Sequence, residues 1–291
     1  MLKGIVPALL TPMTADDEIN EKSTRELVNH LIKAGVHGIF ALGTNGEFHT
    51  LTKEEKLKVA TIVKEEINGR VPLAVGTGGN STSEVIELSQ EMENIGVDVL
   101  SIITPYFDPL SQDELIDHYR NIAGATNLPI ILYNMPSRTG VSLHPDTVAT
   151  LSKIDNIVGI KDSSGNFDNI LKYIENTDDN FSVLSGSDSL ILWTLIAGGS
   201  GAVAATANVF PEIGVSIYNS WKEGHIKKAQ TFQENLRTIR NASQLATVPA
   251  VYKKAVELKG IAIGPPRPPV KEVSADLAEK IQDILNQDSN K

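Results

Sequence analysis

The chain contains no cysteine among its 291 residues. This absence excludes disulfides, iron–sulfur clusters, thiolate zinc sites and cysteine nucleophiles. It agrees with a reducing compartment, and we expect a cytoplasmic location.

Positive charge and long apolar runs are also scarce. Lysine and arginine number 26 against 36 aspartates and glutamates, which gives a formal net charge of −10 at pH 7. Such a chain repels the phosphates of nucleic acids and of anionic membranes. The apolar run over residues 5–10 is followed by Pro12 and is far shorter than the roughly 18 residues that span a membrane. We expect a soluble protein with no signal peptide and no nucleic-acid or membrane partner.

The sequence also lacks the spacing of common metal and phosphate sites. Its six histidines form no His-x-x-x-His pair and no cluster with carboxylates. The glycine-rich segment 76–79 has neither the lysine of a P-loop nor the spacing of a dinucleotide fingerprint. We expect no metal site, and we interpret residues 76–79 as a turn.

Short β-branched apolar runs alternate with longer segments of helical period, which is typical of parallel βα units. Capping boxes, Thr52 with Glu55 and Ser111 with Glu114, mark two of the helix starts. The predicted helices include 21–34, 53–67, 83–95, 112–125 and 144–153. The predicted strands are 4–10, 37–42, 72–76, 99–104, 129–133, 158–161, 182–185 and 202–205.

Eight strands at this spacing favour an α/β fold of the (β/α)8 TIM-barrel type over an open doubly wound sheet, which more often has five to seven strands. Three further helices, over 223–240, 245–259 and 275–286, predict a C-terminal extension. The expected domains are a catalytic barrel over 1–222 and a helical domain over 223–291. The proline-rich segment 264–269 is interpreted as a stiff connector, with a polyproline ligand as the alternative.

In such barrels the chemistry lies at the C-terminal ends of the strands. Lys161 closes an apolar strand, where a lysine can extend its amine to solvent. Alternatively, burial lowers its pKa and leaves a neutral amine able to attack a carbonyl carbon. Tyr133, at the end of the adjacent strand, favours this second interpretation because a phenol can move the protons that imine formation requires. Thr44 and the amides of Gly43, Thr44 and Asn45 are candidates for binding a carboxylate.

Four motifs together resemble the dihydrodipicolinate synthase and N-acetylneuraminate lyase family, and the likeness covers almost the whole chain. The motifs are Gly43-Thr44-Asn45-Gly46-Glu47, Thr104-Pro105-Tyr106, Tyr133-Asn134-Met135-Pro136-Ser137-Arg138-Thr139-Gly140 and Gly159-Ile160-Lys161-Asp162.

The resemblance implies a barrel with a helical C-terminal domain and a homotetramer. It implies class I chemistry on pyruvate or another 2-oxo acid and an aldehyde, with Lys161 as the Schiff-base lysine and Tyr133 and Thr44 as catalytic partners. Thr44 and Asn45 would receive the pyruvate carboxylate, and no cofactor would be needed because the protonated imine is itself the electron sink. Gly43, Gly186 and Val203 complete the predicted substrate-binding residues.

The second substrate stays open between alternatives. Arg138 resembles the arginine with which the synthases of the family orient aspartate semialdehyde, and this favours a condensation that belongs to lysine biosynthesis. Phe107 departs from that pattern, which has a tyrosine donated into a neighbouring subunit's site, and the adjacent Tyr106 points the other way in an extended chain. Asn45 is a second departure. The alternatives are an aldolase of 2-keto-3-deoxy sugar acids or 4-hydroxy-2-oxoglutarate, and a non-catalytic barrel that binds a 2-oxo acid or acts as a regulator.

Overall fold

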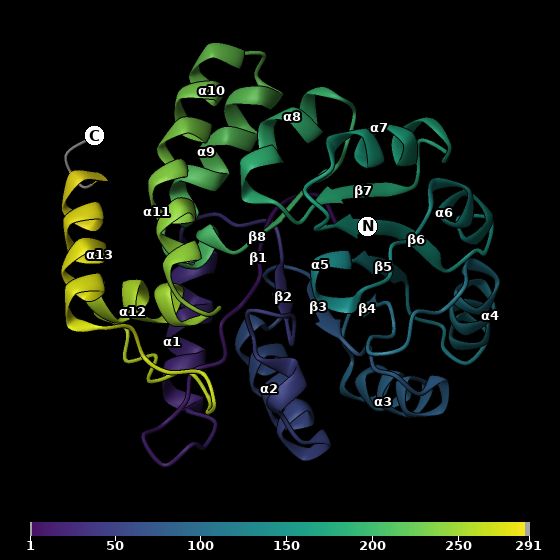
Figure 1. Cartoon of the computed structure of the whole chain (residues 1–291), viewed down its shortest axis with the longest axis horizontal. Helices are drawn as coiled ribbons and strands as arrows, with labels where there is room; N and C mark the ends of the chain where they lie inside the picture. The colour runs from purple at the N-terminus through teal and green to yellow at the C-terminus, as the bar shows by residue number, and fades with distance from the viewer. Residues whose placement is uncertain (1, 289–291) are drawn as a thin grey trace.

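A computed structural model describes residues 2–288 of the chain (Figure 1). Within these residues eight strands form one parallel sheet, as the alternating sequence pattern predicted. The observed strands differ from the predicted ones by up to three residues at an end. They are β1 (Gly4–Pro7), β2 (Ile39–Ala41), β3 (Leu73–Gly76), β4 (Val99–Ile103), β5 (Ile130–Asn134), β6 (Ile157–Asp162), β7 (Ser182–Ser185) and β8 (Gly201–Ala204).

The sheet closes into a barrel through its first strand. β1 pairs with β8 in parallel, from Gly4 opposite Gly201 to Pro7 opposite Ala204. On its other side the chain just after β1 meets β2, where the N–H of Leu9 donates to the carbonyl of Phe40 at 2.8 Å and Ala8 bridges to Phe40. The predicted (β/α)8 barrel is therefore confirmed.

Helices follow the strands and surround the barrel, because crossovers between parallel strands must pass over the outside of the sheet. Both predicted capping boxes are present, at Thr52 with Glu55 and at Ser111 with Glu114. A short helix α5 (Pro136–Thr139) follows β5. The surrounding helices are α1 (Glu21–Lys33), α2 (Lys53–Ile67), α3 (Thr82–Ile95), α4 (Gln112–Ala123), α6 (Pro145–Leu151), α7 (Phe167–Glu175), α8 (Ile191–Ile196) and α9 (Pro211–Lys222).

The buried apolar side chains form two layers. One layer lies between the strands and the helices and takes in most of the core. The other fills the inside of the barrel, as expected for a closed eight-stranded sheet whose successive side chains alternate between its two faces. The inner layer consists of Leu2, Val6, Ala8, Phe40, Ala74, Val99, Ile131, Leu184 and Val203.

The C-terminal extension is helical, but its first two helices differ from the prediction. Gly224 has a φ of 80° and turns the chain, so the predicted helix over 223–240 begins only at Ile226. It also divides near Leu236, whose N–H lies 3.4 Å from the carbonyl of Phe232. The helices of the extension are α10 (Ile226–Asn235), α11 (Arg237–Ala242), α12 (Ala250–Leu258) and α13 (Ala275–Asp288).

The late start of α12 has a simple cause. The predicted helix over 245–259 contains Pro249, which cannot donate a helical hydrogen bond and restricts the residue before it, so the helix begins after it. Short 3-10 helices lie at η1 (Phe48–Thr50), η2 (Asp188–Leu190), η3 (Thr206–Asn208) and η4 (Ser243–Leu245).

The predicted domain boundary after residue 222 coincides with the end of α9. Helix α10 packs against α9 and α8, and α13 lies against α12 (Figure 1). The division of the chain into these two domains stays a prediction. Within residues 2–288, no helix combines the length and the apolar character needed to cross a membrane.

Candidate active site

Lys161 and Tyr133 lie side by side at the C-terminal end of the barrel. β5 and β6 are neighbours, and their register puts Tyr133 directly opposite Lys161. Residues opposite each other in a parallel pair direct their side chains to the same face. Lys161 is only 4% exposed, so its amine does not reach solvent in the way that a surface lysine does.

The amine of Lys161 lies among aromatic rings. Its Nζ is 3.9 Å from the centroid of the Tyr133 ring and 4.6 Å from that of Phe40. Burial lowers the pKa of the Lys161 ammonium, while the nearby Tyr133 and Asp188 act in the opposite direction. A lysine in this setting reaches the neutral, nucleophilic form more readily than a lysine in water.

The hydroxyl of Tyr133 contacts two groups that fix its position. It lies 3.1 Å from the hydroxyl of Thr44, with either group able to donate, and it can donate to the sulfur of Met135 at 2.9 Å. Thr44 belongs to the loop after β2, on the far side of the barrel mouth from β6. A phenol beside Lys161 is thus joined to a second hydroxyl, an arrangement that can pass a proton.

Glycines allow the loop after β2 to approach the site closely. A Cβ on Gly43 would lie 2.5 Å from the ring of Phe40, which is one of the two rings over the Lys161 amine. Gly46 is held by its carbonyl, which accepts a hydrogen bond from the Thr11 hydroxyl at 2.7 Å. A Cβ on Gly46 would lie 3.1 Å from the carbonyl oxygen of Leu9, so a larger residue would be crowded at this position too.

A cavity of about 180 Å³ contains most of the predicted site. Gly186 has to be a glycine there, because a Cβ would lie 2.0 Å from Oγ of Ser163 and 3.0 Å from Cε of Lys161. Gly43 lines a small adjacent cavity with Phe40 and Tyr133. The predicted residues that line the main cavity are Thr44, Asn45, Tyr133, Arg138, Lys161, Gly186 and Val203.

Tyr106 and Phe107 occupy the position at which the family pattern has a tyrosine donated into a neighbouring subunit's site. Tyr106 is half-buried and lines a second cavity of about 180 Å³ with Arg138, Thr44 and Phe48. Phe107 is 92% exposed and has a left-handed backbone, with a φ of 87°. Neither side chain lines the cavity that holds Lys161.

Several residues of the cavity were not predicted. Asp188 is buried, and its carboxylate accepts hydrogen bonds from the N–H groups of Ala205 at 3.1 Å and Thr206 at 2.8 Å. Burial raises the pKa of the Asp188 carboxyl, while these hydrogen bonds and the charge of Lys161 oppose the shift. The signal was available, since Asp188 follows the end of β7. The other unpredicted lining residues are Met135, Ser163, Ser187, Ala205, Arg240, Ser243, Val248 and Tyr252.

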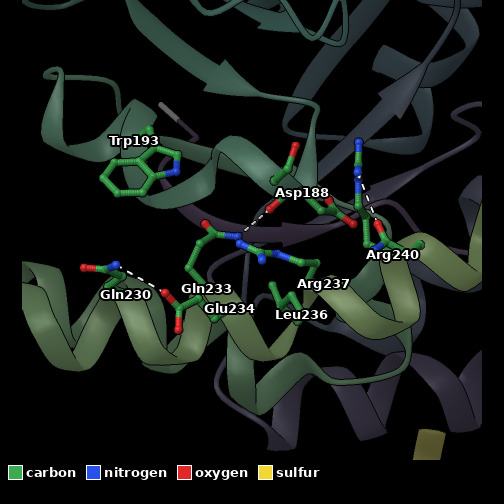
Figure 2. Close-up of a pocket in the computed structure, with 10 residues that line it drawn as sticks. Asp188, Trp193, Gln230, Gln233, Glu234, Leu236, Arg237 and Arg240 are labelled. Atoms are coloured by element: carbon green, nitrogen blue, oxygen red, sulfur yellow. Dashed lines mark hydrogen bonds between the residues drawn. The ribbon is translucent and has the colours of Figure 1, made fainter.

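A larger cavity of about 240 Å³ lies beside the catalytic one (Figure 2). Helix α8 forms one side of it, and helices α10 and α11 form the other. The two cavities share Asp188 and Arg240 in their walls. Gln233 closes the region between the helices, since its side-chain N–H donates to the carbonyl of Asp188 at 2.8 Å. Trp193 lies at the edge and is 41% exposed.

Among residues 2–288, no group of three or more histidine, aspartate or glutamate side chains is arranged to hold a metal ion.

The Dihydrodipicolinate synthetase family model matches residues 1–288. The chain is 44% identical to the 4-hydroxy-tetrahydrodipicolinate synthase of Methanopyrus kandleri, over 97% of this chain and 94% of that protein. It is 40% identical to the enzyme of the same name from Methanothrix thermoacetophila, over 100% of this chain and 98% of that one.

Solved structures agree with these relatives. A prophage protein of the dihydrodipicolinic acid synthase family from E. coli K12, solved in complex with pyruvate, superposes with a TM-score of 0.95 at 35% identity, over 99% of this chain and 98% of that chain. The 4-hydroxy-tetrahydrodipicolinate synthase of Methylacidiphilum fumariolicum SolV gives 0.95 at 34% identity, over 100% and 97%. With a family match along the chain and relatives well above 30% identity, this chain belongs to the dihydrodipicolinate synthetase family.

Proposed function

We propose that the chain is a Schiff-base-forming lyase that condenses pyruvate with aspartate semialdehyde, as a 4-hydroxy-tetrahydrodipicolinate synthase. The observation that carries the proposal is the buried amine of Lys161, 3.9 Å from the centroid of the Tyr133 ring, beside a phenol that contacts Thr44. Relatives of 36–44% identity that bear this name support the choice of reaction.

The reaction begins with attack of the neutral Lys161 amine on the ketone carbon of pyruvate. The carbinolamine loses its hydroxyl as water once that oxygen is protonated, and Tyr133, supplied with a proton through Thr44, is the donor closest to the amine. Asn45 and the amides of the loop after β2 receive the pyruvate carboxylate. The imine that remains carries a positive charge on nitrogen.

The charged imine makes the methyl protons of pyruvate acidic. Removal of one of them gives an enamine, whose carbon attacks the aldehyde carbon of the second substrate. The alkoxide that forms takes up a proton. With aspartate semialdehyde, the amino group of that substrate then attacks the imine carbon and displaces Lys161, which closes the ring and regenerates the free lysine.

Aspartate semialdehyde is expected to be the preferred second substrate. Incubation of the wild-type enzyme with pyruvate and a panel of aldehydes, followed by measurement of pyruvate consumption, tests this directly. The enzyme is expected to turn over the semialdehyde within the usual range of about 1 to 10³ s⁻¹. Faster release of pyruvate from a 2-keto-3-deoxy sugar acid or from 4-hydroxy-2-oxoglutarate would contradict it. Consumption of no 2-oxo acid at all would instead support the non-catalytic barrel.

One observation favours the aldolase alternative. Phe107 has no hydroxyl, so a proton relay from this position to Thr44 and Tyr133 is not possible in this chain. The homotetramer that the family resemblance implies stays a proposal, and the exposed ring of Phe107 is one site at which a neighbouring subunit could make contact. Sedimentation of the full-length protein measures that oligomeric state.

Replacement of Arg138 by Ala is expected to weaken only substrates that carry an acid group. Arg138 lines the cavity, and its guanidinium makes no hydrogen bond to another side chain among residues 2–288, so it is free to hold a carboxylate. Loss of one charge-assisted contact is expected to lower kcat/KM for aspartate semialdehyde roughly 10- to 100-fold. Uncharged aldehydes serve as the matched control. An equal loss with both kinds of aldehyde would mean that Arg138 has a structural role.

A further inference from the structure

Glu47 ends the loop that carries Thr44, and its side chain is buried. Its backbone is left-handed, with a φ of 57°, and the residue is only 2% exposed. The backbone N–H of Glu47 donates to the carbonyl of Thr44 at 3.2 Å, so the two residues belong to one hydrogen-bonded turn. A buried carboxylate destabilises a fold unless it is paired and hydrogen-bonded. The partners of Glu47 therefore govern the shape of this loop.

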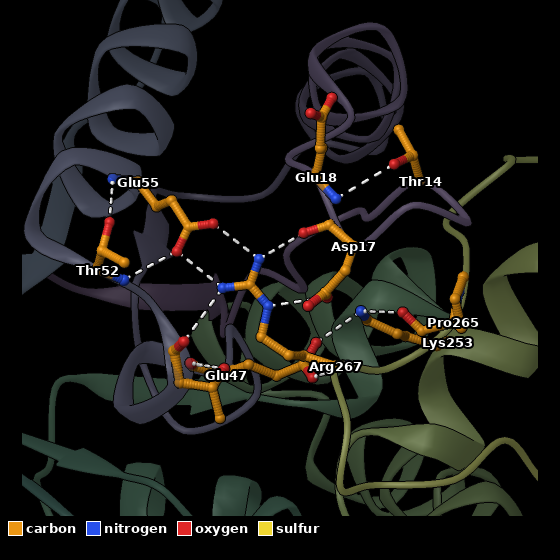
Figure 3. Close-up of polar contacts among 10 residues, drawn as sticks. Thr14, Asp17, Glu18, Glu47, Thr52, Glu55, Lys253, Pro265 and Arg267 are labelled. Carbon is orange, nitrogen blue, oxygen red and sulfur yellow. Dashed lines mark hydrogen bonds and ion pairs between the residues drawn. The ribbon is translucent and has the colours of Figure 1, made fainter.

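Both partners of the Glu47 carboxylate come from the C-terminal extension (Figure 3). Nζ of Lys253 on α12 lies 2.6 Å from Oε1 of Glu47, and the backbone N–H of Arg267 donates to Oε2 at 2.7 Å. Lys253 is 1% exposed and also donates to the carbonyl of Pro265 at 2.8 Å. A buried ion pair thus joins the barrel mouth to the last part of the chain.

The side chain of Arg267 makes a second set of contacts between the segment 264–269 and the barrel. Its guanidinium donates to both carboxylate oxygens of Glu55 on α2, each at 2.7 Å, and to Asp17 at 2.9 Å. It also donates to the carbonyl of Thr50 at 3.1 Å. These contacts agree with the interpretation of the segment 264–269 as a connector, and they hold its backbone where the N–H of Arg267 meets Glu47.

Helix α12 connects the ion pair between Glu47 and Lys253 with the catalytic cavity. Tyr252 lines the cavity, whereas the next residue, Lys253, pairs with Glu47. Successive residues of an α-helix are rotated by about 100°, because a turn takes 3.6 residues, so one helix can serve both places. The helix that forms part of the cavity wall is therefore the helix that holds the loop of Thr44.

We propose that Glu47 and Lys253 are positioning residues, whose buried pair holds the loop after β2 so that the Thr44 hydroxyl stays beside that of Tyr133. The proposal rests on the proposed function, since it assumes that Tyr133 and Thr44 move the protons of the imine. It adds that the C-terminal extension takes part in setting the geometry of the barrel's active site.

The exchange of pyruvate methyl protons with deuterium from solvent is the suitable measurement, followed by NMR. This exchange needs the imine and its proton transfer but no aldehyde. The variant is the double replacement Glu47→Gln/Lys253→Met, which leaves no unpaired buried charge and keeps an oxygen that accepts from the Arg267 N–H. We expect a thermal midpoint near that of the wild type, an exchange rate about 10- to 100-fold lower and a higher KM for pyruvate, because a small misplacement is enough for such losses.

The control is Asp17→Asn, which removes the charge of a half-exposed partner of Arg267 but leaves Glu47 and Lys253 paired. Its exchange rate is expected to stay within about twofold of the wild type. A folded double variant that exchanges as fast as the wild type overturns the positioning role. A second result would also overturn it: a slow exchange rate in Lys253→Met alone that returns to the wild-type rate in the double variant. The pair would then contribute to stability only, because the loop would work without it. If the wild type itself shows no exchange, the proposed Schiff-base function is wrong. This outcome differs from the failure of the positioning role, in which the wild type exchanges and the double variant exchanges equally fast.

Discussion

Replacement of Lys161 by Met is expected to abolish turnover, with a loss on the order of 10⁶-fold, the size seen when a covalent nucleophile is removed from an enzyme. Methionine keeps an unbranched apolar stem against Phe40 and Tyr133, so the cavity loses the amine and little else. The steady-state rate with pyruvate and aspartate semialdehyde measures the effect. Because burial of the ammonium disfavours its charged form, the variant is expected to be at least as stable as the wild type.

Borohydride trapping gives this prediction a direct control. With pyruvate present, reduction of the wild type is expected to add the mass of the reduced adduct to the peptide that contains Lys161. Lys253 is an equally buried lysine outside the cavity, and its peptide is expected to gain no mass. Adduct on the Lys161→Met variant, or residual activity near the wild-type level, would show that another residue forms the imine.

Replacement of Tyr133 by Phe is expected to lower the rate roughly 10² to 10⁴-fold, which is the usual contribution of a general acid or base. The ring remains, so its packing against Phe40, with centroids 6.4 Å apart, and its contact with the Lys161 amine are kept. Only the hydroxyl that contacts Thr44 is removed. The rate of imine formation with pyruvate, followed by borohydride quenching over time, measures the step that depends on this hydroxyl.

Tyr119 offers a matched control for that variant. It is also a buried tyrosine, and its hydroxyl donates to the carbonyl of Ile102 at 3.0 Å, away from the cavity. Tyr119→Phe is expected to cost about 1 kcal/mol of the free energy of unfolding and to leave the rate unchanged. If Tyr133→Phe behaves in the same way, the phenol has no role in proton transfer.

The barrel and the positions of Lys161 and Tyr133 could be predicted from the sequence, because local patterns and the pairing of adjacent strands determine them. Eight apolar runs and their helical spacers were enough to predict the barrel. Lys161 and Tyr133 close adjacent parallel strands, so their proximity follows once the strands are assigned. The strand ends differed from the prediction because turns and bridges such as that between Ala8 and Phe40 decide where regular pairing stops.

The unpredicted part depends on contacts between distant segments or on unusual backbone conformations. Tyr252 and Arg240 enter the cavity only through the placement of the C-terminal helices, which no local pattern encodes. Phe107 and Glu47 adopt left-handed backbones, a region that residues with a Cβ seldom occupy and that their residue types do not suggest. Asp188 could have been found, since it lies just after the end of β7, in the region where the predicted site residues were sought.

The closure of the barrel has a consequence for synthesis of the protein. β1 pairs with β8, and Glu47 meets Arg267, 220 positions later in the chain. During translation β1 therefore waits for most of the chain to emerge before it has its second neighbour, and an unpaired strand edge favours aggregation. Contacts of such long range also make folding slow. A chain that stops before Arg267 would lack the contacts that hold the loop of Thr44, so shortened products of interrupted translation are expected to be inactive even where their barrels close.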